Sequence, residues 1–384
     1  MGKTRFFALT LCLVVFAAAI PTAAASQGQP VPAVHTTDLY RPHGDPDDHW
    51  DLATVYALAC GDYLELEGIV GNYTRLAVLE GQDVQGFGDP DALSVAQMNH
   101  LTAMPVPFMV GYPRRLPARG TTVPDASESD LAGAKLILQA LEETDRPVDL
   151  YITGQARDVA IAGSRHPELF AEECRRIYLV AGLSDSDTNR EWNCQLDPYA
   201  FSTIFDLPCD IYWLPCFEDI RHENDSLHLI GGEYCSLYSF RQEEILPGLS
   251  PRVQKFFAYM FRDGHYQQEP KEPTMQWLRY LRRPKEKDVL REHNQKSRRM
   301  WSTPAFFHSA GLTVTKDGDI RQAGKRRVSA AYSFQPVNLS CTDRGVVDWS
   351  RTDEPSNHYI LHVDPDHYED AMTEALRSLL QELP

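Results

Sequence analysis

Short apolar segments alternate with amphipathic segments through the first two-thirds of the 384-residue chain. The apolar segments have strand length and turn residues at their ends, which predicts β-strands at Ala33–Thr37, Leu66–Gly71, Val106–Val110, Val148–Thr153, Arg176–Ala181 and Asp210–Pro215. Apolar positions at helical spacing predict helices at Trp50–Gly61, Ala92–Ala103, Ser127–Glu143, Ala156–Ser164 and Pro198–Phe205. The alternation predicts an α/β fold, in which helices cover both faces of a mostly parallel, twisted sheet and the crossovers are right-handed.

The pattern changes between residues 217 and 300, where the sequence is irregular, aromatic and charged. We interpret this segment as a helical and irregular insertion that caps one end of the sheet, with a helix at Pro251–Phe261. Its basic run Arg279–Lys287 suits a solvated helix face, and an anion site is the alternative. Antiparallel strands are predicted at Arg327–Phe334 and Tyr359–Val363, before a helix from Pro365 to Leu383. Because no repeat or linker divides the chain, residues 26–384 are expected to form one domain.

The first 25 residues have the order of a secretory signal peptide. Lys3 and Arg5 precede an apolar run from Phe6 to Ile20, and Ala23–Ala25 supply small residues for cleavage. A permanent membrane anchor is the alternative, but the apolar run is short for a bilayer span. We therefore expect a secreted or periplasmic protein without a membrane anchor after cleavage.

The chain is acidic, with a formal net charge of −17 at pH 7. Nucleic acids and anionic membranes bind basic surfaces, so neither is expected as a partner. Seven of the eight cysteines lie beyond the leader, and no two of them form a Cys-x-x-Cys motif that would indicate a zinc ribbon. The spacing of Cys194, Cys209 and Cys216 permits a disulfide, and isolated buried thiols are an equally good interpretation.

Four aspartates follow the first predicted strand within eleven residues, at Asp38, Asp45, Asp47 and Asp48. Ligands of open α/β sheets bind beyond the carboxyl ends of strands, so this position favours a functional site. Clustered carboxylates repel one another, and a hard divalent cation such as calcium or magnesium would remove that repulsion. The alternative is structural, because aspartates also form turns and cap helix N-termini.

Other polar groups follow later strands. Glu191-Trp192-Asn193 places a carboxylate, an indole and an amide together, a combination that suits a polyol ligand with an aromatic group. Asp197-Pro198 is typical of a helix start, so the whole run could also be a capped loop. The chain has no Gly-x-Ser-x-Gly, His-Glu-x-x-His or glycine-rich phosphate-loop motif, which disfavours a serine hydrolase, a zincin or a protein that binds nucleotide phosphates through such a loop.

These motifs occur in the order found in one known family. Thr37-Asp38 and Asp45-Pro46-Asp47-Asp48, followed by Glu67–Asn72, resemble the N-terminal signature of the inosine-uridine preferring nucleoside hydrolases. Thr153-Gly154 is similar to the start of that family's Thr-Gly-Pro-Leu-Thr-Asn turn. The run from Glu191 to Pro198 is similar to its Glu-Phe-Asn…Asp-Pro element. The chain thus resembles a divergent, secreted member of the family over nearly all of its mature length.

The resemblance implies a hydrolase that cleaves the N-glycosidic bond of ribonucleosides or related glycosides with a calcium-activated water. Asp38 would be the catalytic base and, with Asp48 and the backbone carbonyl of Arg157, a calcium ligand. The implied substrate-binding residues are Asp47, Asn72, Glu191, Trp192 and Asn193. The family is usually oligomeric, which implies a homo-oligomer here too.

The chain departs from the family pattern in three places, the first of which is a longer stretch between Asp38 and the Asp47-Asp48 pair. The first Asp of the usual Asp-x-Asp is Thr36, and the late acid that completes the family's metal site corresponds to Ser302-Thr303. A hydroxyl is a neutral and weaker calcium ligand than a carboxylate. His308 is near in sequence, but its partly apolar segment favours a structural role over that of a leaving-group acid. The alternative function is therefore a secreted protein that binds a nucleoside or glycoside without cleaving it.

Overall fold

The computed structural model describes residues 28–39, 47–72, 92–184, 191–218, 220–223, 226–229, 232–261, 287–324 and 328–384. The predicted leader, Asp45 and most of the basic run Arg279–Lys287 lie outside these residues. Within them, no helix has both the length and the apolar character needed to span a membrane.

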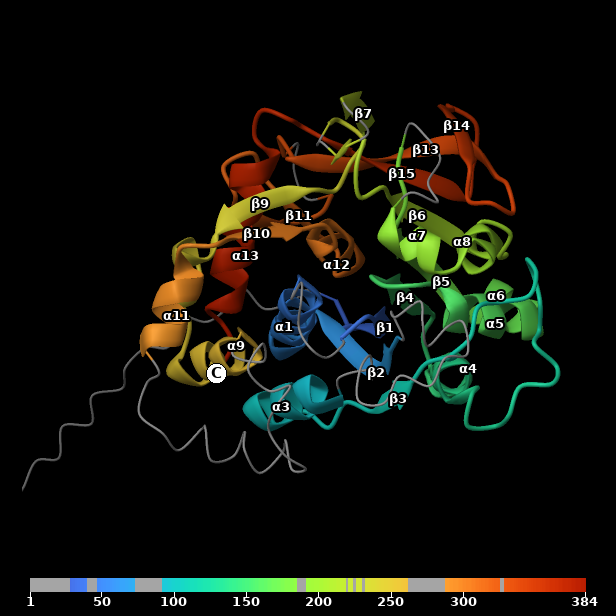
Figure 1. The fold of residues 1–384 in the computed structure, drawn as a ribbon, viewed down its shortest axis with the longest axis horizontal. Helices are drawn as coiled ribbons and strands as arrows, with labels where there is room; N and C mark the ends of the chain where they lie inside the picture. The colour runs from blue at the N-terminus through green and yellow to red at the C-terminus, as the bar shows by residue number, and fades with distance from the viewer. Residues whose placement is uncertain are drawn as a thin grey trace, which may run out of the picture.

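A nine-stranded sheet organises the fold (Figure 1). Its order from edge to edge is β14 (Val347–Arg351), β13 (Tyr332–Cys341), β15 (His358–Val363), β6 (Asp210–Leu214), β5 (Cys174–Val180), β4 (Val148–Ile152), β1 (Val31–Thr37), β2 (Leu64–Gly71) and β3 (Phe108–Val110). The strands from β15 to β3 are parallel, and β13 pairs antiparallel with both β15 and β14. The predicted mostly parallel α/β fold is confirmed.

The central strands are apolar on both faces because helices cover both. Along β1, Ala33 packs into one hydrophobic cluster and the next residue, Val34, packs into the other. Successive side chains of a strand point to opposite faces of the sheet, which produces this division. Because helices cover both faces, consecutive positions of the strand need to be apolar.

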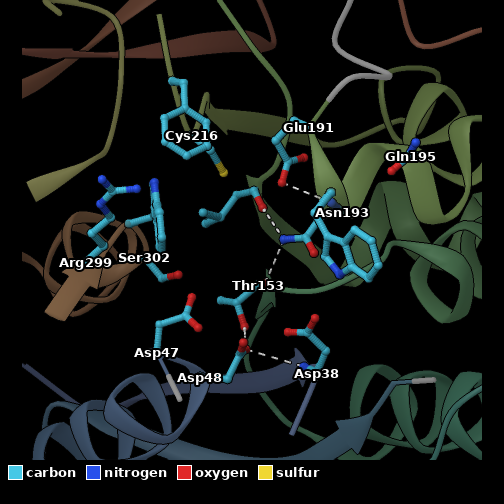
Figure 2. A pocket seen from close by; sticks show the side chains of 14 residues that line it. Asp38, Asp47, Asp48, Thr153, Glu191, Asn193, Gln195, Cys216, Arg299 and Ser302 are labelled. Atoms are coloured by element: carbon cyan, nitrogen blue, oxygen red, sulfur yellow. Dashed lines mark hydrogen bonds between the residues drawn. The ribbon is translucent and has the colours of Figure 1, made fainter. Parts of the chain in front are cut away.

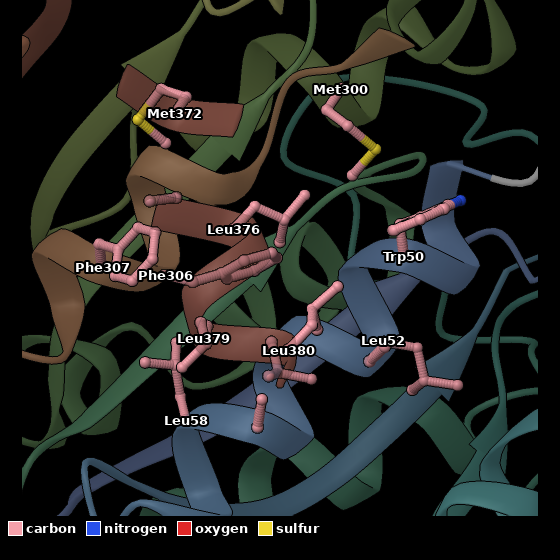
Figure 3. Close-up of a cluster of buried hydrophobic side chains, with 14 of the residues drawn as sticks. Trp50, Leu52, Leu58, Met300, Phe306, Phe307, Met372, Leu376, Leu379 and Leu380 are labelled. Atoms are coloured by element: carbon pink, nitrogen blue, oxygen red, sulfur yellow. The ribbon is translucent and has the colours of Figure 1, made fainter. Parts of the chain in front are cut away.

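The first cluster lies between the sheet and helices that come from distant parts of the chain (Figure 3). They are α1 (Asp47–Cys60), α3 (Ala92–Thr102), α9 (Pro251–Phe261), α12 (Thr303–Ser309) and α13 (Tyr368–Leu380). The second cluster lies beneath α4 (Ala132–Glu143), α5 (Arg157–Arg165), α6 (Pro167–Glu173) and α8 (Pro198–Ile204). Short α7 (Trp192–Leu196) precedes α8.

The segment 217–300 has more regular structure than predicted. It contains the hairpin strands β7 (Ile220–Glu223) and β8 (Ser226–Leu229), and β9 (Tyr238–Arg241) pairs antiparallel with β10 (Ser297–Met300). The 3-10 turns η2 (Gln242–Glu244) and η3 (Leu246–Gly248) lead into α9, and α11 (Lys287–Asn294) precedes β10. The helix at Pro251–Phe261 has the predicted bounds.

The C-terminal prediction needs correction. The strand predicted at Arg327–Phe334 begins at Tyr332 and continues to Cys341, and β14, which pairs with it, was not predicted. Both strands are only partly buried, so their apolar positions alternate weakly with polar ones. The small hairpin of β11 (Leu312–Val314) and β12 (Ile320–Gln322) precedes them. The seven described cysteines are free thiols, and six of them are buried. Of the two interpretations of Cys194, Cys209 and Cys216, the structure therefore agrees with isolated buried thiols and not with a disulfide.

Candidate functional site

A cavity of about 440 Å³ opens at the carboxyl ends of β1, β4, β5 and β6. In the sheet, β2 and β3 follow β1 on one side, whereas β4, β5 and β6 follow it on the other. Such a switch point between β1 and β4 leaves a crevice in which ligands bind. The described residues that line the cavity are Asp38, Asp47, Asp48, Thr153, Val180, Glu191, Trp192, Asn193, Gln195, Cys216, Phe217, Arg299, Trp301 and Ser302 (Figure 2).

Three predicted aspartates come together at the floor of this cavity (Figure 2). Asp38 directly follows β1, while Asp47 and Asp48 open α1, where the helix dipole favours negative charge. Asp48 Oδ1 accepts hydrogen bonds from Thr153 Oγ1 at 2.9 Å, from the Asp38 backbone N–H at 3.4 Å and from the Thr37 hydroxyl. Donors from β1 and from the end of β4 therefore fix the Asp48 carboxylate.

Asp38 carries an electrostatic cost at this position. Burial raises its pKa well above the usual range, and the neighbouring Asp48 carboxyl and Asp47 charge raise it further. Close carboxylates repel one another, so ionised Asp38 is held here at a cost.

The donor chemistry fits a hard divalent cation. Asp38, Asp47 and Asp48 offer carboxylate oxygens into one cavity, and a cation would relieve the repulsion that raises the Asp38 pKa. Within the described part of the chain, however, no three acidic, His or Cys side chains form a complete metal cluster. The cation that these residues would hold therefore needs further oxygen ligands from water, substrate or neutral groups.

The Glu191-Trp192-Asn193 run forms a second wall of the cavity. Glu191 caps α7, and its carboxylate accepts backbone hydrogen bonds from Gly182 at 2.7 Å, Asn193 at 2.9 Å and Cys194 at 3.0 Å. Burial raises the Glu191 pKa, and these bonds oppose the shift. The structural and functional interpretations of this run are thus compatible, because the capped loop holds the carboxylate at the cavity.

Asn193 and Trp192 differ in how firmly they are held. Asn193 Nδ2 donates to the carbonyls of Thr153 at 3.1 Å and Val180 at 3.4 Å, which ties the ends of β4 and β5 together. Trp192 is 49% exposed at the cavity wall. An exposed indole beside a polar cavity offers a flat apolar surface to an aromatic group of a ligand.

Two predicted residues do not line the cavity. Asn72 is fully buried beside Gly154, and neither of its amide atoms has a hydrogen-bond partner among the described residues. Arg157 is also fully buried, with its guanidinium donating to the Tyr112 carbonyl at 3.1 Å and its Nε 3.7 Å from Asp197 Oδ2. Their roles in substrate and metal binding stay predictions.

Ser302 lies at the cavity, as its correspondence to the late family acid predicts, and its hydroxyl points toward the Asp47 side (Figure 2). Thr303 faces away, because its hydroxyl hydrogen-bonds with Tyr238 at 2.7 Å. His308 lies in an aromatic cluster and not at the cavity. Its Nδ1 is 2.8 Å from the Tyr178 hydroxyl, and burial, with Arg176 and Arg175, lowers its pKa to about 3. A neutral His308 in this cluster suits the structural role.

Sequence reasoning missed several residues of the site. Asp51 is buried on α1 one turn after Asp47 and Asp48, and Gln195, Cys216, Phe217 and Arg299 line the cavity from other elements. Asp51 had a detectable signal, because residues three and four apart on a helix share a face and it follows Asp47 and Asp48 at that spacing. No local pattern marks the others, which long-range folding brings to the cavity.

No protein-family model matches the chain. No curated protein sequence matches it significantly. Among solved structures, the type III effector protein XopQ complexed with adenosine diphosphate ribose has a TM-score of 0.53 at 12% identity, covering 93% of this chain and 95% of that chain. The effector protein XOO4466 has a TM-score of 0.50 at 14% identity, with coverage of 93% and 95%.

A purine-preferring ribonucleoside hydrolase from Gardnerella vaginalis is also similar, with 15% identity, a TM-score of 0.48, and coverage of 91% of this chain and 99% of that chain. At these identities the likeness concerns the fold alone. The chain therefore has a mostly parallel α/β fold with helices on both faces of a nine-stranded sheet, and it is similar in this fold to the effector proteins XopQ and XOO4466.

Proposed function

We propose that this protein is an exported hydrolase that cleaves the N-glycosidic bond of a ribonucleoside or related glycoside, with a water activated by calcium. The observation that carries the proposal is the convergence of Asp38, Asp47 and Asp48 with Glu191 and Asn193 around one cavity. The bound ligand of the neighbour XopQ, adenosine diphosphate ribose, contains a ribose and supports a ligand of this class. The apolar leader of residues 1–25 supports export.

The proposed chemistry assigns roles to the residues of the cavity. When bound at Asp38 and Asp48, calcium would polarise a water and the sugar diol. Asp38 would take the proton from the attacking water as general base. Asp47 and Asn193 hold sugar hydroxyls. The fixed Glu191 carboxylate stabilises the positive charge that develops on the sugar ring.

Free-sugar release is the direct test of this proposal. The purified protein should release sugar from at least one member of a panel of purine and pyrimidine ribonucleosides and nitrophenyl ribosides when calcium is present. Chelation with EDTA should remove the activity, and added calcium should restore it. Absence of release from the whole panel with calcium present would contradict the enzymatic proposal.

Non-catalytic binding is the second candidate, because the neutral Ser302 lies at the cavity where the resemblance implies an acid. Titration calorimetry distinguishes the two functions. A binding protein would bind a nucleoside with measurable heat and no turnover over hours, whereas an enzyme would convert the bound nucleoside to free sugar and base.

Substitution of Gly154 tests whether the proposed activity depends on the position of Asp38. A Cβ at Gly154 would lie 2.8 Å from Asn72 Oδ1 and 3.1 Å from both the backbone N and the Cβ of Asp38. Gly154→Ala must therefore shift the Asn72 amide and press on Asp38 by a fraction of an ångström. Because a displacement of about 1 Å costs about 100-fold, kcat/KM should fall by about 3–10-fold. Gly28→Ala, whose Cβ would meet nothing within 4 Å, is the control. Equal kcat/KM for both variants would contradict the prediction.

A further inference from the structure

We propose that the buried His35 is a positioning residue, which directs the Thr153 hydroxyl at the Asp48 carboxylate and thereby sets which carboxylate oxygen meets the ligand. The inference rests on the proposed function, which places a cation and a sugar in this cavity. His35 itself is not among the described residues that line the cavity, so it acts from behind the site.

His35 lies in β1, three residues before Asp38. It is opposite Tyr151 in the register of β1 and β4, so its side chain shares a face of the sheet with Thr153, two residues after Tyr151. The imidazole is fully buried, and the Phe306 ring meets it edge-on at a centroid distance of 5.4 Å. An aliphatic side chain would fill this pocket without the cost of burying a polar ring, so the imidazole calls for an explanation.

Two hydrogen bonds connect His35 with Asp48. His35 Nε2 is 2.9 Å from Thr153 Oγ1, and Thr153 Oγ1 donates to Asp48 Oδ1 at 2.9 Å (Figure 2). The Thr36 carbonyl is a second acceptor near this hydroxyl, but it lies 3.4 Å away and carries no charge. The shorter bond to a carboxylate is the stronger of the two. His35, Thr153 and Asp48 therefore form a relay, in which the hydroxyl bridges the imidazole and the carboxylate.

The single proton of the Thr153 hydroxyl determines the tautomer of His35. Once Thr153 donates that proton to Asp48, its oxygen accepts from His35, so Nε2 carries the hydrogen. The opposite direction would set lone pairs of Thr153 and Asp48 against each other and place a hydrogen on His35 Nδ1, which has no hydrogen-bond partner among the described residues. Both changes cost free energy in a buried site. Burial also lowers the pKa of His35 to about 4, although the Asp48 charge opposes the shift, so the ring is neutral.

The relay determines which oxygen of Asp48 faces the ligand. The three described donors to this carboxylate are the Thr153 hydroxyl, the Thr37 hydroxyl and the Asp38 backbone N–H, and all of them reach Oδ1. Oδ2 is thereby the oxygen that would meet a cation or a sugar hydroxyl in the cavity. A donor held from behind keeps this orientation when the cavity is filled, as groups behind metal ligands do elsewhere.

Nitrogen NMR of the histidine side chains tests the direction of the relay without an assay of activity. In protein labelled with nitrogen-15 at its histidines, long-range proton–nitrogen correlation at neutral pH distinguishes a protonated Nε2 from a protonated Nδ1. The His35 signals are those that disappear in His35→Gln. We expect a hydrogen on Nε2 and none on Nδ1. A hydrogen on Nδ1 would overturn the relay, whether or not Nε2 carries one too.

Calcium titration calorimetry on the purified protein tests the effect of the relay on the site. Thr153→Val removes the hydroxyl at nearly constant shape and should weaken calcium binding by about 10–100-fold, the range for groups behind metal ligands. His35→Leu removes the donor behind that hydroxyl and should weaken binding by about tenfold. The double variant should bind about as weakly as Thr153→Val, because His35 then has no route to Asp48. His166→Leu, at an exposed histidine between α5 and α6, is the control and should leave the affinity unchanged.

Conservative variants separate positioning from packing. His35→Gln keeps an N–H donor near the place of Nε2 and Thr153→Ser keeps the hydroxyl, so each should bind calcium within about threefold of the unmodified protein, less than the loss of a hydrogen bond. His35→Leu should melt at or above the temperature of the unmodified protein, since it removes an Nδ1 atom without a described partner. A purely structural His35 predicts a lower melting temperature for His35→Leu, an unchanged affinity and no difference between Leu and Gln.

The outcomes distinguish this inference from the proposed function. If the unmodified protein binds calcium and His35→Leu binds it equally well, the relay is excluded while the proposed function stands. If the unmodified protein binds no calcium at millimolar concentration, the calcium dependence of the proposed function is overturned, and the role of the relay in calcium binding falls with it. Should His35→Leu fail to fold, the tautomer of His35 and the comparison of His35→Gln with Thr153→Val decide between these outcomes.

Discussion

Asp38→Asn should lower kcat/KM for the proposed nucleoside hydrolysis by about 10³-fold or more, because it removes both the proposed base and a proposed charged calcium ligand. Asparagine keeps the shape of the side chain, and it relieves the repulsion with Asp48 that raises the Asp38 pKa. The variant should therefore fold and melt at or above the temperature of the unmodified protein. Initial rates of sugar release, measured over a range of nucleoside concentrations, give the effect.

Asp353→Asn is the matched control for this measurement, since Asp353 is an exposed aspartate in the turn before β15. It should retain full activity. A folded Asp38→Asn protein that keeps kcat/KM within threefold of the unmodified enzyme would remove Asp38 from the mechanism. It would also favour a site in which Asp47 or Glu191 supplies the base.

Arg175→Ala should lower the free energy of unfolding by about 3 kcal/mol, through loss of the partner of a buried carboxylate. Asp149 lies in β4 at 0% exposure and accepts hydrogen bonds from Arg175 Nε at 2.7 Å and Nη2 at 2.5 Å, with a third from Ser309 Oγ at 2.5 Å. Without the guanidinium, the carboxylate stays buried with one neutral donor. Urea unfolding followed by circular dichroism measures the change.

The control for this prediction is Arg321→Ala. Arg321 pairs with Asp319 at 2.7 Å, but both side chains are more than half exposed, so the loss should be about 1 kcal/mol or less. If the two variants lost the same stability, the Asp149–Arg175 pair would not act as a buried ion pair. The two losses should differ clearly, because only one of them leaves an uncompensated charge in the sheet.

The sequence by itself predicted the parallel part of the fold well. The strand at Asp210–Leu214 and the helix at Pro251–Phe261 occur where apolar periodicity predicts them, and Asp197-Pro198 opens a helix as expected. These features depend on local patterns, since a strand covered on both faces needs a continuous apolar run and a helix start needs a capping side chain. Because β13 and β14 are only partly buried, their apolar pattern is weak, so the bounds of β13 were predicted wrongly and β14 was not predicted.

For the aspartates after β1, sequence reasoning determined their place at a strand end and left a bound cation and a capped turn as alternatives. The tertiary structure decided which groups join them. Thr153 donates a hydrogen bond to Asp48 across 105 residues, and Ser302 reaches the cavity from the start of α12, far along the chain. Such contacts follow from strand order and helix packing, because local periodicity carries no record of which distant residue completes a hydrogen bond.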